Sequence, residues 1–94
     1  MEREKRIEQL AALGMTRYEA AVYMALLERR GHSPAQVAAH AGVPRQRIYD
    51  VLASLSARGL CLERHVGGQR QFVAVDPAAA LPALMGAAWR AAGA

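Results

Sequence analysis

The stretch GVPRQRIYDVLASLSARGL, residues 42–60, contains the pattern that decides how this chain folds. Its apolar side chains recur at i, i+3, i+4 and i+7: Ile48, Val51, Leu52 and Leu55. That spacing predicts an α-helix with one buried face. Pro44 suits the first helical position, where no N–H donor is needed, and Gly59 suits the residue just past a helix. We therefore expect a helix over residues 44–58.

The first turn of this helix is cationic where the helix dipole is already positive. Arg45 and Arg47 lie there. Cations at this end of a helix destabilise it by a few tenths of a kcal/mol, and binding of an external polyanion would offset this destabilisation. Arginine contacts guanine and glutamine contacts adenine in the major groove of DNA. The residues of this helix expected to contact DNA are Pro44, Arg45, Gln46, Arg47, Tyr49 and Ser54. The alternative is that both arginines are ordinary solvated side chains, paired with Asp50.

Three helices are predicted before this one. The ranges are residues 2–13, 17–30 and 34–41. The second and third each follow a capping box, in which two side chains three residues apart satisfy each other's backbone N–H groups: Thr16 with Glu19, and Ser33 with Gln36. The third and fourth helices are joined by a tight turn at Gly42, which predicts a helix-turn-helix.

After residue 60 the pattern changes from helical to extended. Residues 61–66 and 69–75 are strand candidates, and the intervening Gly67-Gly68 is typical of a β-hairpin turn. The hairpin is expected to be anchored to the core by Leu60, Leu62, Phe72, Val73 and Val75. Polar groups at its tip, together with the start of helix 34–41, are expected to contact the DNA backbone: Ser33, Gln36, Arg64, His65, Gln69 and Arg70.

The order of these elements is that of a winged helix-turn-helix. Asp76-Pro77 predicts a last helix over about residues 77–92. The expected fold is therefore mainly α with a small β-hairpin, with flanking N- and C-terminal helices. Ninety-four residues are enough for one domain, so we expect a single unit over residues 1–94 with its core in about residues 16–75.

Composition favours an anionic partner and excludes several classes of protein. Twelve Lys and Arg stand against eight Asp and Glu, and the pI is about 10.0; this balance suggests nucleic acid or an anionic membrane surface, or merely a solvated basic surface. No apolar run approaches the roughly 20 residues of a membrane span, and the charged start is not a signal peptide. Cys61 is the one cysteine, so no internal disulfide forms, and a cytoplasmic location is expected.

Catalytic and metal-binding patterns are missing from the sequence. His32, His40 and His65 lack metal-ligand spacing, and Cys61 stands in an apolar strand, where it is expected to be a small core residue. We therefore expect no enzyme activity, no cofactor, no metal and no small-molecule ligand.

Three segments in order resemble the DNA-binding domain of TrmB-type transcriptional regulators. They are LGMTRYEAAVYMALLERRG (residues 13–31), SPAQVAAHAGVPRQRIYDVLASLSARGL (33–60) and QRQFVAVDPAAAL (69–81). The resemblance implies a winged helix that binds operator DNA as a dimer, with residues 44–58 as the recognition helix. Longer members of the family carry a C-terminal sugar-sensing domain. These 94 residues contain no counterpart of it, which leaves open a short member or one domain of a longer protein.

Two functions are therefore expected, in different classes. The first is sequence-specific binding of double-stranded DNA by a homodimeric transcriptional regulator, with helix 44–58 in the major groove and hairpin 61–75 as the wing. The alternative is a winged-helix protein-interaction module with weak or no DNA binding. Apolar residues of the first and last helices are the expected dimer interface: Ile7, Leu10, Leu81, Leu84, Met85 and Trp89. The competing interpretation is that Trp89 packs on its own core.

Overall fold

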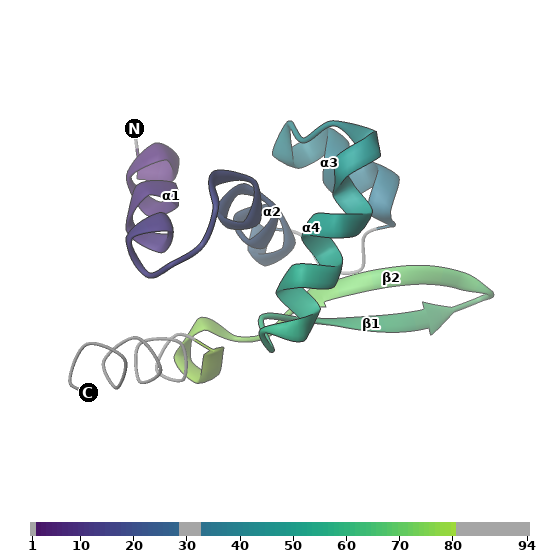
Figure 1. The fold of residues 1–94 in the computed structure, drawn as a ribbon. Helices are drawn as coiled ribbons and strands as arrows, with labels where there is room; N and C mark the ends of the chain where they lie inside the picture. The colour runs from purple at the N-terminus through teal and green to yellow at the C-terminus, as the bar shows by residue number, and fades with distance from the viewer. Residues whose placement is uncertain (1, 29–32, 81–94) are drawn as a thin grey trace.

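A computed structural model describes residues 2–28 and 33–80 of the chain. Its elements, in order, are α1 (Glu2–Ala12), α2 (Arg17–Glu28), α3 (Pro34–Ala41), α4 (Arg45–Ala57), β1 (Cys61–Val66) and β2 (Gln69–Ala74). In Figure 1, α4 runs from α3 towards the hairpin, and the hairpin projects beyond the helices. Helix α2 lies between α1 on one side and α3 and α4 on the other. The predicted winged helix-turn-helix, mainly α with a small antiparallel hairpin, is confirmed.

Both predicted capping boxes are present. At the start of α2, the Glu19 N–H donates to Thr16 Oγ1 at 3.0 Å, and the Thr16 N–H donates to Glu19 Oε1 at 2.8 Å. The same reciprocal pair joins Ser33 and Gln36 before α3. Each box satisfies backbone donors that the first turn of a helix leaves unpaired, so the local sequence fixes where these two helices begin.

The turn between α3 and α4 sets where α4 begins. Gly42 ends α3 in the left-handed conformation, with φ 71° and its N–H bonded to the Ala38 carbonyl, a geometry that glycine adopts without strain. Pro44 was predicted as the first helical residue, and this is wrong by one position. Its ψ of 139° is extended, so Pro44 is the N-cap and α4 begins at Arg45. The Pro44 carbonyl accepts the N–H of Arg47 at 2.9 Å.

The core lies between α2, α4 and the base of the hairpin. The predicted apolar face of α4 is buried, and it consists of Ile48, Val51, Leu52 and Leu55. It belongs to one core cluster with residues of α2, with Leu60 just before the hairpin and with Phe72 in β2. Of the two tyrosines on α2, Tyr23 is fully buried and Tyr18 covers an edge. The Tyr23 hydroxyl donates to the Val75 carbonyl at 2.8 Å, which ties the end of the wing to α2.

The hairpin has the tight turn that its two glycines predict. Val66 pairs with Gln69, and both Gly67 and Gly68 have positive φ, at 58° and 78°, as the favoured two-residue turn requires. Leu62 was predicted to anchor the hairpin, and this is wrong, because its side chain is 61% exposed. Successive strand residues point to opposite faces, so the burial of Cys61 directs Leu62 to solvent.

The ends of two predicted helices lie outside the described residues. The helix predicted to reach residue 30 is described to Glu28, and the last helix is described only over residues 77–80. Within that start, the Asp76 carboxylate accepts the Ala78 N–H at 2.8 Å, as predicted for a cap. The predicted interface residues Leu81, Leu84, Met85 and Trp89 all fall beyond this point.

Candidate nucleic-acid interface

The first turns of α4 present an open, cationic surface. Arg45, Gln46, Arg47 and Tyr49 are exposed, because they lie opposite the apolar stripe that packs on α2. Within residues 2–28 and 33–80, neither Arg45 nor Arg47 forms an ion pair, with Asp50 or with any other carboxylate. Two positive charges therefore stand unneutralised beside the positive end of a helix dipole, which is the arrangement that attracts a polyanion.

Arg47 has a neighbour that the sequence did not predict. Its guanidinium lies over the ring of Tyr18, 6.0 Å from the ring centroid. This contact connects the exposed face of α4 to the start of α2. Its distance is one at which a cation and an aromatic face attract each other. Asp50, Val51 and Ser54 line the same shallow hollow as Tyr18 and Arg47.

The wing brings a second group of predicted residues close to α4. Ser33, Gln36, Tyr49, Gln69 and Arg70 line one hollow between the start of α3, α4 and the hairpin. They come from three elements, and only the tertiary fold gathers them. In the Ser33–Gln36 cap the side-chain oxygens serve as acceptors. The Ser33 hydroxyl and the Gln36 amide group keep their donor hydrogens, which suits contact with phosphate oxygens.

Arg70 differs from the other wing residues because its charge is already paired. The Glu63 carboxylate on β1 accepts a hydrogen bond from Arg70 Nε. This bond is the main reason why the pKa of Glu63 is lowered, and it raises the pKa of Arg70. His65 Nε2 lies 3.8 Å from the same carboxylate. Arg64 and Gln69, the other two predicted wing contacts, are exposed and have no ion pair or hydrogen bond to Glu63.

Ser54 was predicted to contact DNA, which stays a prediction, and in the structure this half-buried residue has an internal partner. Its hydroxyl donates to Glu19 Oε2 at 2.7 Å, and Glu19 is only 5% exposed. Arg58 Nη1 lies 3.2 Å from the same carboxylate oxygen and also donates to the Gly14 carbonyl. The hydroxyl of Ser54 is therefore part of the junction between α2 and α4.

The pKa of Glu19 reflects this junction. Burial alone would raise it, but the hydrogen bond from Ser54 lowers it, as do the Thr16 backbone and Arg58 through its hydrogen bond and charge. The balance lies below the usual pKa of a glutamic acid. Sequence reasoning identified Glu19 only as a capping residue, since its partners lie 35 and 39 positions away.

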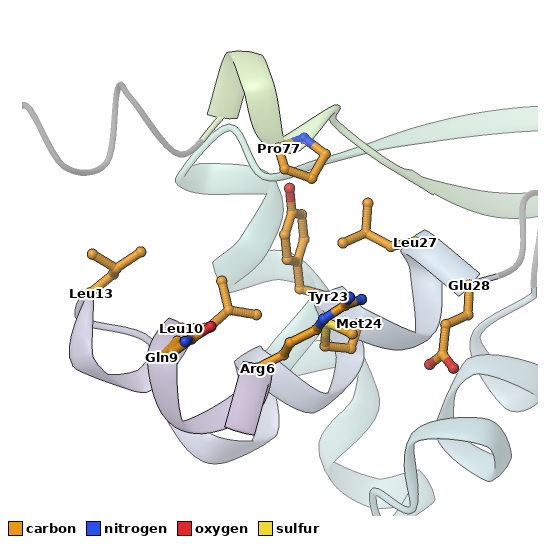
Figure 2. Close-up of a pocket in the computed structure, with 9 residues that line it drawn as sticks. All are labelled: Arg6, Gln9, Leu10, Leu13, Tyr23, Met24, Leu27, Glu28 and Pro77. Carbon is orange, nitrogen blue, oxygen red and sulfur yellow. The ribbon is translucent and has the colours of Figure 1, made fainter. Parts of the chain in front are cut away.

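The predicted dimer residues Ile7 and Leu10 are largely covered within the chain, and their place in an interface stays a prediction. Each is 7% exposed and packs in the core cluster, because α1 lies on α2. An apolar groove remains beside them, between α1, α2 and Pro77 (Figure 2). Its lining residues are Arg6, Gln9, Leu10, Leu13, Tyr23, Met24, Leu27, Glu28 and Pro77. Figure 2 shows Leu13, Leu10 and Leu27 along it, with the Tyr23 hydroxyl directed towards Pro77.

Other kinds of site have little support in the described part of the chain. It contains no group of three His, Cys, Asp or Glu side chains that could hold a metal ion. None of its helices has the length and apolar character needed to cross a membrane. Cys61 is 1% exposed, as predicted for a core residue, and burial raises the pKa of its thiol, which makes it a poor nucleophile.

Sequence comparison finds one protein family over most of the chain. Residues 10–78 match the family described as "Sugar-specific transcriptional regulator TrmB". The HTH-type sugar sensing transcriptional regulator TrmBL1 of Pyrococcus furiosus is 35% identical over 74 residues, which are 79% of this chain and 21% of the relative. The uncharacterized protein YrhO of Bacillus subtilis is 40% identical over 73 residues, or 78% of this chain and 26% of the relative. The chain thus spans about a fifth to a quarter of these relatives.

Solved structures with the same fold are also regulators or DNA-binding proteins. TrmBL2, described as an archaeal chromatin protein with a novel mode of DNA binding, superimposes with a TM-score of 0.87 at 28% identity. The match covers 99% of this chain and 36% of that one. A MarR family transcription regulator gives a TM-score of 0.65 at 19% identity, covering 96% of this chain and 60% of that one. At that identity the likeness is one of fold alone.

Proposed function

Because this chain belongs to the TrmB family of transcriptional regulators, we propose that it binds double-stranded DNA sequence-specifically, as a homodimer. In this proposal α4 enters the major groove and the wing lies on the flanking backbone. The observation that carries it is the exposed first turn of α4, where Arg45 and Arg47 have no carboxylate partner in the described part of the chain. The family and the fold neighbours are regulators or DNA-binding proteins and not enzymes, in agreement with the expectation from sequence.

Each exposed group has a chemical role in this proposal. Arg45 and Arg47 bind guanine or phosphate, and Gln46 contacts adenine, because their donors and acceptors match those base edges. The donor hydrogens of Ser33 and Gln36 bind a backbone phosphate beside the start of α3. Arg64, His65 and Gln69 contact the backbone next to the wing. Contacts with about six phosphates predict that the logarithm of the binding constant falls with the logarithm of the salt concentration with a slope of about −5.

The homodimer has a geometric consequence. Two copies related by a two-fold axis would place their α4 helices in successive major grooves, about 34 Å apart, on a palindromic site. The apolar groove beside α1 and α2 supports a second copy as partner, because exposed apolar surfaces of this kind mark interaction sites. Leu27 is a suitable probe, since it lines the groove and is exposed. The variant Leu27→Arg should give monomers in light scattering, and persistent dimers would place the interface elsewhere.

The test of DNA binding is a selection on random duplexes at stated salt, followed by anisotropy titration of the selected site. The double variant Arg45→Ala/Arg47→Ala should abolish specific binding and leave the thermal midpoint within a few degrees. The matched control is Lys5→Ala/Arg17→Ala, which removes the same charge from α1 and α2. This control should weaken binding far less, because neither residue lies on α4 or the wing.

Two outcomes would contradict the proposal. Survival of specific binding in Arg45→Ala/Arg47→Ala would show that α4 is not the recognition helix. Failure of the unmodified protein to select any sequence, together with no retention on a heparin column, would favour the protein-interaction module.

A further inference from the structure

Tyr49, Arg70 and Phe72 come together where the wing meets α4, and we call this group the stack. The guanidinium of Arg70 lies 5.7 Å from the ring centroid of Tyr49 on α4 and 5.6 Å from that of Phe72 on its own strand. Glu63, opposite Phe72 in the hairpin register, holds the Arg70 Nε–H. Phe72 is buried in the core, so the stack connects the core, the wing and the recognition helix through one guanidinium.

This position makes Arg70 unlike the other arginine of the wing. Side chains alternate between the two faces of the hairpin, and Arg64 belongs to the opposite face from Arg70. Arg64 has no ion pair among residues 2–28 and 33–80, whereas the charge of Arg70 is compensated by Glu63. A compensated arginine whose guanidinium lies near two rings is held in place by its neighbours. Its contribution to phosphate binding is correspondingly small.

Tyr49 is the group that the stack holds. It is 55% exposed and is the largest apolar side chain on the open face of α4. Its neighbours on that face are polar, charged or small, with Asp50 and Ala53 in the same hollow. Although Arg70 lies beside its ring, more than half of the Tyr49 surface is open to the surroundings. The base-edge feature of the major groove that an apolar surface can recognise is the C5-methyl group of thymine.

We propose that Tyr49 reads a thymine methyl group in the major groove and that Arg70 is the positioning residue that holds its ring for this contact. The inference rests on the proposed function, since it requires α4 to enter the groove. It assigns specificity to a tyrosine and takes Arg70 out of the set of phosphate contacts predicted from sequence.

The experiment compares thymine with uracil, which lacks only the methyl group. Each thymine of the selected site is replaced in turn by deoxyuridine, and affinity is measured over a range of salt. The unmodified protein should lose about four-fold at one position in each half-site, the worth of one buried methyl group. Tyr49→Phe should keep this ratio, because the ring remains, and Tyr49→Ala should abolish it.

The variants of Arg70 separate positioning from charge. Arg70→Ala should lower the thymine-to-uracil ratio towards one and leave the salt slope unchanged. Arg70→Lys keeps the charge but lacks the planar guanidinium, and should not restore the ratio. The matched control Arg64→Ala should do the reverse, lowering the slope by about one and keeping the ratio.

A measurement without DNA tests the stack itself. The Arg70 Nε–H resonance should shift in Tyr49→Ala, because an aromatic ring nearby perturbs it, and an unchanged resonance would refute the stack in solution. If the unmodified protein binds a selected site but no thymine position depends on Tyr49, the inference fails alone. If Arg70→Ala lowers the salt slope and leaves the thymine-to-uracil ratio unchanged, Arg70 is a phosphate contact, and this result would also overturn the inference. If no sequence is selected, the proposed function itself fails.

Discussion

Glu19 and Arg58 meet at 3.2 Å although 39 residues separate them in the chain. Glu19 lies in the first turn of α2, and Arg58 is the residue that ends α4. Ser54, one turn earlier in α4, donates to the same carboxylate. This junction links α4 to α2 through one buried carboxylate, in addition to the apolar contacts between the two helices.

Removal of that carboxylate should destabilise the domain. Glu19→Ala deletes a capping acceptor, worth about 1 kcal/mol, and hydrogen bonds to a charged group, worth about 1.5–3 kcal/mol. The free energy of unfolding should therefore fall by about 2–4 kcal/mol, measured by urea denaturation. Glu8 is exposed on α1, and Glu8→Ala should change stability by less than about 0.5 kcal/mol. Equal effects of the two substitutions would contradict the role of the junction.

Acid should weaken the domain through the same residue. The pKa of Glu19 is lowered in the folded protein from its ordinary value of 4.5, so the unfolded chain binds the proton more readily. The stabilisation is fully present well above pH 4.5 and is lost as the pH falls through the folded pKa. Glu19→Gln should flatten this acid limb in thermal melts between about pH 5 and pH 2.

The pH experiment needs a control on the wing. The pKa of Glu63 is also lowered, mainly by the hydrogen bond from Arg70, but this pair is exposed to solvent. Screening by water makes such a pair contribute little to stability, so Glu63→Gln should leave most of the acid limb in place. An acid limb that survives Glu19→Gln and disappears in Glu63→Gln would reverse the assignment.

The hydroxyl of Tyr23 should contribute measurably to stability. It donates to the Val75 carbonyl at 2.8 Å from a buried position, so Tyr23→Phe leaves that bond unmade. The cost should be about 1–2 kcal/mol, seen as a lower denaturation midpoint with an unchanged slope. Tyr18→Phe is the matched control, because that ring is partly exposed, and should have almost no effect. A neutral Tyr23→Phe would show that the wing is held without this bond.

The turn of the wing should tolerate asparagine but not a branched side chain. Gly67 has φ of 58°, and a Cβ added there would meet nothing within 4 Å, so any penalty comes from backbone conformation alone. Gly67→Asn should be nearly neutral, because asparagine adopts this conformation in hairpin turns. Gly67→Val should cost about 1–2 kcal/mol. Similar melting temperatures for the two variants would argue against the turn geometry.

Features of this protein that depend on neighbouring residues could be predicted from the sequence. The capping boxes before α2 and α3, the apolar face of α4 and the glycine turn of the wing follow from interactions over one to seven positions, which any reader of the sequence can count. The exposure of the cationic start of α4 could also be predicted from the sequence, because burial of one helix face leaves the opposite face in solvent. Burial of Cys61 likewise follows from its place in an apolar strand, as predicted.

Which polar residues already have a partner within the chain depends on how the elements pack, and the sequence did not predict it. Ser54 and Arg70 look like DNA contacts in the sequence, but Glu19 and Glu63 engage them. Ile7 and Leu10 look like an interface, but α2 covers them. The physical reason is that a side chain's partners depend on the angle and distance at which whole elements pack. Those quantities arise from many weak contacts between segments far apart in the chain, and no local pattern encodes them.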